Sequence, residues 1–415
     1  MWTSGVACAP VTTLILEANR LHRASALRAI ALVILGCGCT FYQPPGDCPA
    51  PASVGGAPGT GGAKATGGSP NRGGSTGAGG GANGGTSTST GGKAPAGTWE
   101  DITGDLAGKD VTVPGITYVA AQPGDDTLIA GVTGVGLFRG DANGETWEAL
   151  GQGKGSEEIA HIVTSIVFDP EDPERFWETG MYGGGGLLTT TDGGNTFARL
   201  GLEVLDHNDL VSVDFTDPDR NTLLVGWHEQ KQRLYRSQDG GEHWDNVGEN
   251  VPASCGFSSS PLVLDDQTFL LGCGTQIVRS GDAGETWETV SEAGGAGAPL
   301  RTTDGSIYWR IDSNFGLMFS DNDGIDWTRT TEYGVLYGNL LELPDGRLAA
   351  VGNRTIVVSD DDGRNWSDAT TTMPFAPGGV TYSTENRAFY IWTASPDPKV
   401  PEESILKYDW DYEQE

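Results

Sequence analysis

Residues 280–287, Ser-Gly-Asp-Ala-Gly-Glu-Thr-Trp, form a motif that the chain repeats five more times. Close copies occupy residues 190–197, 237–244, 320–327 and 359–366, and a more divergent copy occupies residues 140–147. The aromatic residue that ends each copy recurs at intervals of 50, 47, 43, 40 and 39 residues. Because a period of about 40 to 50 residues is typical of β-propeller blades, the motif predicts a repeat array.

The residue types of the motif favour a tight turn between two strands. A Ser or Thr hydroxyl and an Asp carboxylate can accept hydrogen bonds from nearby backbone amides. The glycine common to all copies (144, 194, 241, 284, 324 and 363) fits a position with φ > 0. The aromatic residue then begins the next strand. The acidic position is filled by Asp192, Asp239, Asp282, Asn322 and Asp361, and by Ala142 in the divergent copy.

These turns resemble the Asp-box, or BNR, repeats of sialidase, sortilin and xyloglucanase propellers. The resemblance covers residues 97–415 and implies that each box joins the third and fourth strands of a blade. It also implies a structural role for the boxes, on the rim and away from the ligand face. The chain is closest in kind to single-domain propellers such as the photosystem II assembly factor. A sialidase is disfavoured because the Arg-Ile-Pro motif is absent, its nearest match being residues 310–312, Arg-Ile-Asp.

The two ends of the repeat region decide the number of blades. Candidate strands at residues 379–383, 388–394 and 404–410 follow the sixth box and leave the last blade one strand short. Residues 98–102, Thr-Trp-Glu-Asp-Ile, resemble the strands that follow the boxes, but no blade precedes them. We therefore predict an all-β, single seven-bladed propeller over residues 97–415, closed by its N-terminal strand. In its third blade, strands are expected at 211–215, 222–227, 233–237 and 244–247.

The N-terminal region is expected to direct export. Residues 1–36 have arginines followed by a short apolar run, and they resemble a bacterial lipoprotein signal that ends before Cys37. Cys37 is then the lipidation site, with Cys39 as the alternative; an ordinary secretory signal is the other interpretation. Residues 37–96 are rich in Gly, Ser and Thr, which predicts a disordered tether behind the anchor. The propeller is accordingly expected outside the cytoplasm, at the cell envelope.

The net charge of the chain restricts its possible partners. The formal net charge is −31, from 56 acidic and 25 basic residues, which disfavours nucleic acid and direct contact with anionic membranes. We expect a monomer that meets the membrane only through its lipid anchor.

Cys255 and Cys273 flank the first hairpin of the fourth blade, so antiparallel pairing and export favour a disulfide. Two buried thiols are the alternative.

Candidate site residues gather on the loops of the second and third blades that face away from the boxes. The connections between blades supply Glu158, His161, His207 and Asp209, and the loops after the second strands supply Tyr182, Trp227, His228 and Glu229. The glycines at 183–186 beside Tyr182 fit no phosphate-loop pattern.

Three interpretations of these residues remain open. The first is a binding or scaffold module for a protein or glycan, with His161, Tyr182, His207, Trp227 and His228 as contacts. The second is a glycoside hydrolase, which needs two carboxylates, drawn from Asp209, Glu229 and Glu158. The third is a metal site formed by the three histidines and Glu229, which no local ligand spacing supports. Calcium at the boxes is disfavoured because the twelve-residue EF-hand frame is missing. We therefore expect no cofactor and no metal.

Overall fold

The structure is a computed structural model, and it describes residues 95–413 apart from 108–114, 142, 145, 152, 156–157, 202–203, 258–259, 312–315, 332–335 and 394–402. The expected signal, Cys37, Cys39 and nearly all of the tether lie outside the described residues. Within the described part of the chain, no helix has the length and apolar character needed to cross a membrane.

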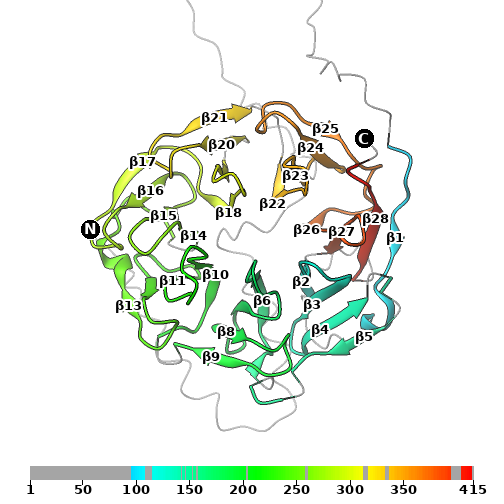
Figure 1. Ribbon diagram of the computed structural model, residues 1–415, viewed down its shortest axis with the longest axis horizontal. Helices are drawn as coiled ribbons and strands as arrows, with labels where there is room; N and C mark the ends of the chain where they lie inside the picture. The colour runs from blue at the N-terminus through cyan, green and yellow to red at the C-terminus, as the bar shows by residue number, and fades with distance from the viewer. Residues whose placement is uncertain are drawn as a thin grey trace, which may run out of the picture. The chain divides into compact units, whose positions relative to one another are not determined.

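Seven four-stranded antiparallel sheets form a ring (Figure 1), which confirms the predicted propeller. Blades one to three are β2 (Ile116–Ala121), β3 (Thr127–Val132), β4 (Gly136–Asp141) and β5 (Trp147–Ala149); β6 (Ile162–Phe168), β7 (Phe176–Met181), β8 (Leu187–Thr190) and β9 (Ala198–Leu200); β10 (Asn208–Val213), β11 (Leu223–Trp227), β12 (Leu234–Ser237) and β13 (Asp245–Asn246).

Blades four to seven follow the same order. They are β14 (Ser260–Val263), β15 (Phe269–Gly272), β16 (Ile277–Ser280) and β17 (Glu288–Ser291); β18 (Ala296–Arg301), β19 (Ile307–Arg310), β20 (Leu317–Ser320) and β21 (Thr328–Thr331); β22 (Tyr337–Glu342), β23 (Leu348–Val351), β24 (Ile356–Ser359) and β25 (Ser367–Asp368); β26 (Pro377–Ser383), β27 (Ala388–Thr393), β28 (Ile405–Asp409) and β1 (Glu100–Asp101). Two short 3-10 turns, η5 (Gly104–Leu106) and η7 (Val247–Asn250), are the other regular elements described.

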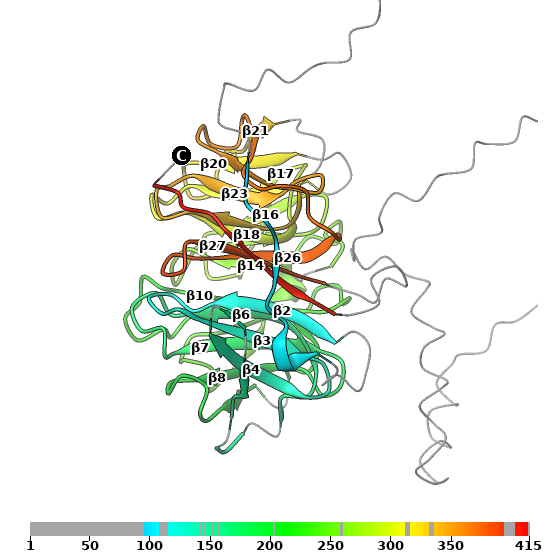
Figure 2. The same cartoon turned by 90° about the vertical axis from the view of Figure 1, so that its right-hand side faces the viewer.

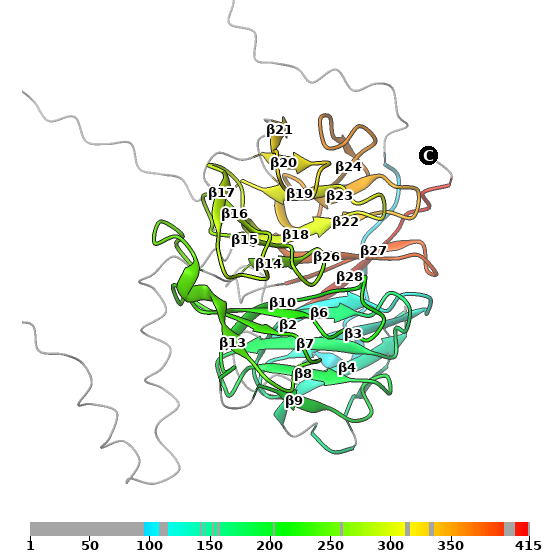
Figure 3. The same ribbon diagram turned by 60° about the vertical axis from the view of Figure 1, so that its left-hand side comes forward.

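The first strand of each blade lines the inside of the ring and the fourth lies outside (Figure 1). Figure 3 shows successive sheets following one another around the ring from β6 to β21. The core therefore lies between blades, and the middle strands are covered on both faces. In β7, for example, Phe176 packs in a cluster with blade one, while its neighbour Trp177 packs in a cluster with blade three. Such burial explains why the middle strands read as apolar runs.

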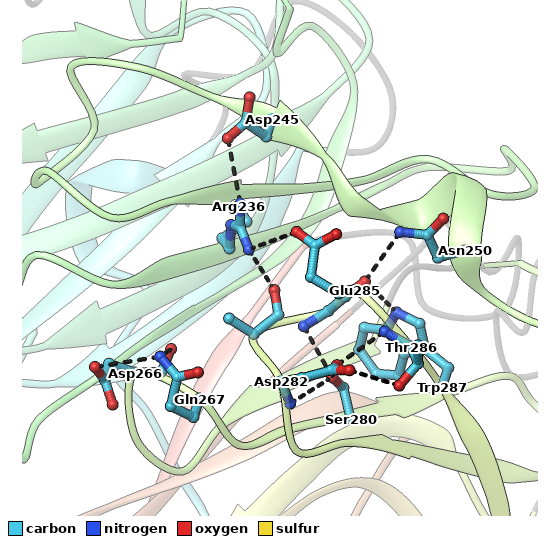
Figure 4. Close-up of polar contacts among 12 residues, drawn as sticks. Arg236, Asp245, Asn250, Asp266, Gln267, Ser280, Asp282, Glu285, Thr286 and Trp287 are labelled. Atoms are coloured by element: carbon cyan, nitrogen blue, oxygen red, sulfur yellow. Dashed lines mark hydrogen bonds and ion pairs between the residues drawn. The ribbon is translucent and has the colours of Figure 1, made fainter.

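The boxes form the turns that their residue types predict (Figure 4). In blade four, Ser280 Oγ accepts a hydrogen bond from the Gly284 amide at 2.8 Å, and Asp282 accepts bonds from the amide and hydroxyl of Thr286 at 2.8 and 2.6 Å. The Thr286 hydroxyl and amide, followed by the Ser280 hydroxyl, hold the pKa of Asp282 below its usual value. The Trp287 indole donates to the Gly284 carbonyl at 3.1 Å.

The box glycines have a second role that the motif did not reveal. All six have positive φ, between 64° and 99°. Each also faces a residue of the preceding blade so closely that a Cβ would collide with it or press against it. The pairs are Gly144 with Ile102, Gly194 with Leu150, Gly241 with Leu200, Gly284 with Val247, Gly324 with Leu270 and Gly363 with Leu317. The boxes thus join blade to blade as well as strand to strand.

Arginines that precede three boxes strengthen the same contact. Arg139 donates to the carbonyl of Gly193 at 2.7 Å, Arg236 to that of Ala283 at 2.5 Å, and Arg279 to that of Asp323 at 3.0 Å. Each acceptor belongs to the box of the next blade. Figure 4 shows Arg236 also meeting Asp245 and Glu285. These arginines therefore lie on the rim, as their position just before the boxes in the sequence indicates.

The N-terminal strand closes the ring as predicted. β1 pairs with β28, with Glu100 opposite Lys407 and Asp101 opposite Leu406. Figure 2 shows the cyan N-terminal segment running across the outside of the red C-terminal strands. The Ile102 amide donates to the Ile405 carbonyl at 2.9 Å. The Trp99 ring lies 5.0 Å from that of Tyr408.

Some strand limits in blade three differ from the prediction. The first strand runs from 208 to 213 rather than from 211 to 215, because Asp214 begins the following turn and accepts the amide and hydroxyl of Thr216 at 2.8 and 2.6 Å. The fourth strand covers only Asp245–Asn246, since Asn246 caps the 3-10 turn by accepting the Gly248 amide. In blade four, Cys255 and Cys273 form a disulfide, with Cα atoms 4.9 Å apart.

Candidate functional site

Strand order places the candidate residues at the end of the blades opposite the boxes. Successive turns of an antiparallel sheet alternate between its two ends. The boxes join third to fourth strands, so the loops after the second strands and the connections between blades lie at the other end. Tyr182 follows β7, His207 and Asp209 lie at the start of β10, and His228 and Glu229 follow β11.

Three of these side chains form a continuous hydrogen-bonded series. Asp209 Oδ1 lies 2.7 Å from His228 Nδ1, and His228 Nε2 lies 3.0 Å from the Tyr182 hydroxyl. An ionised carboxylate only accepts hydrogen bonds, so Nδ1 carries the imidazole proton. In the neutral ring, Nε2 is then the acceptor for the Tyr182 hydroxyl proton. The series therefore runs from carboxylate through imidazole to phenol.

The environment of His228 makes the ring more basic. Burial lowers its pKa, but the hydrogen bond and the charge of Asp209, with a contribution from the charge of Glu229, raise it above the usual value. Glu229 Oε1 lies 3.9 Å from His228 Nε2. Asp209 and Glu229 therefore meet the two different nitrogens of the same imidazole ring.

The Tyr182 loop is fixed by backbone contacts. Tyr182 has φ 56°, a region that bulky residues rarely adopt, and its carbonyl accepts the Gly185 amide at 2.9 Å. Arg199 donates to the carbonyls of Gly184 and Gly185 at 2.8 and 2.9 Å. Glu158 lies 3.7 Å from Arg199, so it borders this loop rather than the imidazole. In this loop, Tyr182 is 44% exposed.

His207 completes the surface group around Tyr182. Its ring centroid lies 5.6 Å from that of Tyr182 in an edge-to-face arrangement, and its Nδ1 lies 3.2 Å from Asp206. The His207 carbonyl accepts the His228 amide at 2.7 Å, which ties the two loops together. We call Tyr182, His207, Asp209, His228 and Glu229 the Tyr182 cluster.

Trp227 lies beside this cluster and faces a different direction. Its ring is partly buried in the core between blades two and three, and lies 5.7 Å from the Tyr235 ring. The guanidinium of Arg233 stacks over it at 5.5 Å. Trp227 therefore already has an aromatic and a cationic neighbour within the protein.

His161 lies apart from the surface. Its Nε2 is 2.7 Å from Glu178 Oε1, and neither side chain has any exposed area. His161 packs over Gly180, and both Gly180 and Glu178 point to the face of β7 that Phe176 shares, which is turned toward blade one. His161 cannot touch a surface ligand from this position, and the three histidines do not converge on one metal. Sequence reasoning missed Glu178, although an acidic residue inside the apolar strand Phe176–Met181 was the available signal.

Two surface features lie at opposite ends of the blades, and only the first is at the end of the Tyr182 cluster. Four large apolar side chains are exposed in the described part of the chain, and Val135, Tyr182 and Phe257 occupy loops on the side of the Tyr182 cluster. The fourth, Ile325, lies in a box. An open pocket of about 220 Å³ lies at the first-to-second strand turns of blades five to seven, and Glu342 and Tyr382 are among its lining residues. None of the predicted site residues lines that pocket.

Comparison with known proteins supports the fold. Residues 136–274 match the profile of the family described as sortilin, neurotensin receptor 3. Xyloglucanase Xgh74A of Acetivibrio thermocellus is 25% identical over 279 residues, which cover 57% of this chain and 32% of that protein. A xyloglucanase of Paenibacillus sp is 24% identical over 287 residues, covering 60% of this chain and 27% of that protein. The chain thus spans about a third or less of the length of these relatives.

Two solved structures show the same architecture. The GH74 enzyme of Niastella koreensis superposes with a TM-score of 0.54 at 15% identity, covering 72% of this chain and 43% of that one. YCF48 bound to a D1 peptide superposes with a TM-score of 0.50 at 15% identity, covering 76% of this chain and 95% of that one. At such low identity these likenesses concern the fold alone. The chain thus has the seven-bladed β-propeller fold and resembles these proteins in fold.

Proposed function

We propose that the protein is an exported propeller that binds a protein or carbohydrate ligand at the Tyr182 cluster. The observation that carries the proposal is Tyr182 itself, an exposed aromatic side chain held on a strained and tightly bonded loop. Aromatic rings offer a large contact area at low entropic cost, and the flanking imidazoles and carboxylates offer hydrogen bonds that fix a polar ligand. YCF48, which shares the architecture over nearly its whole length, was solved with a bound peptide.

The surroundings of the cluster support a larger contact surface. The Tyr182 loop borders the connection before β6, since a Cβ on Gly183 would lie 3.2 Å from the Ala160 carbonyl oxygen. That connection borders the β3–β4 turn that carries Val135, since a Cβ on Gly136 would lie 3.4 Å from the Ile159 carbonyl oxygen. The loops of Val135 and Tyr182 thus border the same connection between blades, a suitable arrangement for a ligand larger than one side chain.

Export and anchoring complete the proposal. The signal-like residues 1–36, Cys37 and the Gly-rich tether support a domain held at the cell envelope by lipid.

Replacing Tyr182 with Ala is expected to weaken ligand binding about 30-fold, because losing a central aromatic anchor costs about 2 kcal/mol. Ligands would first be found by screening the full chain on an array of plant and bacterial glycans and on a peptide library. Affinities of the hits would then be measured by calorimetry. Ile325→Ala, which removes an exposed apolar side chain from a box, is the matched control and should bind normally. Equal binding by Tyr182→Ala and the parent would exclude this site.

A glycoside hydrolase is the second candidate, favoured by the two carboxylates, Asp209 and Glu229, beside His228 and by the xyloglucanase relatives. In that case the full chain should release reducing sugar from xyloglucan. Asp209→Asn and Glu229→Gln should each reduce the rate by at least about 100-fold. Hydrolysis that neither substitution alters would rule out both assignments, and Glu158→Gln would then be measured.

A further inference from the structure

We propose that Tyr182, His228 and Asp209 form a catalytic relay in which the Tyr182 phenol takes the acyl group of a neutral carboxylic ester. This activity goes beyond ligand binding and uses the cluster differently from a glycosidase. Asp209 orients the imidazole, His228 acts as the base and Tyr182 is the nucleophile. A nucleophile hydrogen-bonded to a base that a third group orients is the general signature of nucleophilic catalysis.

Three separate elements bring the relay together. Asp209 comes from β10, His228 from the loop after β11 and Tyr182 from the loop after β7. The two hydrogen bonds, of 2.7 and 3.0 Å, are within the reach required for proton transfer. Exposure falls from the outer end inward, since Tyr182 is 44% exposed while the side chains of Asp209 and His228 are 23% and 10% exposed. The nucleophile is thus the part that an incoming substrate meets.

The backbone at the relay is strained in two places. Tyr182 has φ 56° and Glu229 has φ 52°, and neither residue is of a type that favours this region. Such a backbone conformation is unfavourable and persists only where its surroundings impose it. The bonds from Arg199 and from the Gly185 amide impose it on the Tyr182 loop. The strained loop therefore places the Tyr182 hydroxyl next to His228 Nε2.

The chemical step balances with the groups present. The Tyr182 oxygen attacks the ester carbonyl carbon, and the phenol proton moves to His228 Nε2. The bond from carbon to the leaving oxygen then breaks, and His228 returns the proton to the departing alkoxide. The product is an acyl-tyrosine, an aryl ester. His228 then takes a proton from a water molecule, whose oxygen attacks the acyl carbon. The bond from that carbon to the Tyr182 oxygen breaks, the carboxylic acid leaves, and His228 returns the proton to the Tyr182 oxygen.

Local charge selects the kind of substrate. Glu229 lies 3.9 Å from the nitrogen that bonds Tyr182, and Asp206 lies beside His207 at 58% side-chain exposure. These carboxylates would repel a phosphate ester or another anion approaching the phenol. A neutral ester, such as an O-acyl group on a sugar or on a small alcohol, meets no such repulsion.

The test uses 4-nitrophenyl acetate and the purified full chain. We expect an initial release of nitrophenolate, with the acetyl group found by mass spectrometry on the peptide that contains Tyr182. Tyr182→Phe should remove this label completely. His228→Gln should slow labelling of Tyr182 by about 10²- to 10⁴-fold, as expected for loss of a general base, and Asp209→Asn by at least about tenfold. His243→Thr is the matched control, because it removes an exposed histidine bonded to Asp239 in a box.

The pH profile distinguishes a base from a structural residue. Only the neutral imidazole accepts the phenol proton, so wild-type labelling should rise with pH through the titration of His228, whose charged and titratable neighbours are Asp209, Glu229 and Tyr182. The His228→Gln profile should lack this step. Near-ultraviolet circular dichroism would verify folding, and Asp209→Asn provides the same test if His228→Gln is unfolded. Acetyl groups confined to amines, or Tyr182 labelled at the parent rate in His228→Gln, would overturn the proposal.

Discussion

Deleting residues 99–103 is expected to abolish cooperative folding of the propeller. The deletion removes β1 from the seventh blade, together with the Trp99 contact to Tyr408 and the buried Ile102. Burial of these two side chains and the hydrogen bonds of the strand contribute roughly 5 kcal/mol or more. This is a large part of the total stability of a typical domain, about 5–15 kcal/mol. The deletion also exposes the edge of β28, which favours aggregation.

A point substitution tests the same closure without removing a strand. A Cβ on Gly144 would collide with the carbonyl oxygen of Ile102, whereas a Cβ on Gly124 would meet nothing. Both glycines have positive φ, 64° and 71°, so Gly124→Ala is a matched control for backbone strain. We expect Gly144→Ala to be at least about 2 kcal/mol less stable than Gly124→Ala in urea unfolding. Parental melting of the deletion variant, or equal stability of the two alanine variants, would contradict the closure.

Arg220→Met is expected to destabilise the protein by about 3–5 kcal/mol. Arg220 bonds Asp169 through Nε at 2.9 Å and through Nη2 at 2.8 Å, and the two side chains are only 2% and 4% exposed. The pair joins the first turn of blade three to that of blade two. Methionine leaves Asp169 buried without its cation but keeps the volume and the positive φ of 56°. The melting temperature should fall by about 4–8 °C, because a domain of this size has a large unfolding entropy.

The pH dependence of this effect has a definite sign. Burial raises the pKa of Asp169, but the Arg220 hydrogen bond, with help from the Glu171 amide, lowers it below its usual value. The stabilisation is therefore present above the unfolded-state pKa of about 4 and is lost as pH falls through the lower folded-state pKa. The difference in unfolding free energy between the parent and Arg220→Met should therefore narrow below about pH 4. Arg364→Met, which breaks an exposed pair with Asp362, should cost no more than about 1 kcal/mol at any pH.

The fold could be predicted because its repeated turn uses local chemistry. Ser280, Asp282 and Gly284 act on backbone groups within a few residues, so the pattern is visible in any one copy. The closing strand followed from counting strands at the two ends. The contact between Gly144 and Ile102 was not predictable, because it depends on how far each blade rotates relative to the last. The pair of Asp169 and Arg220 was missed for the same reason.

The sequence predicted which loops carry the candidate residues, but it did not predict which side chains contact one another. Strand order placed Tyr182, Asp209 and His228 at one end of two adjacent blades. The choice among the histidines depended on which face of a strand each side chain takes. His161 and His228 both lie near strand ends, but His161 pairs with Glu178 inside the core while His228 pairs with Asp209 near the surface. A bulge in β10 between Asn208 and Val211 shifts the local register, and alternation along the sequence does not reveal such a bulge.

The first and last described strands share one sheet, so no blade is set apart by the architecture as the first blade of the ring. The seam between β1 and β28 is one of many places at which a closed circle of blades can be cut, and each cut leaves both ends of the polypeptide side by side. The present cut determines where the described part of the chain begins, which is beside β1, the outermost strand of blade seven.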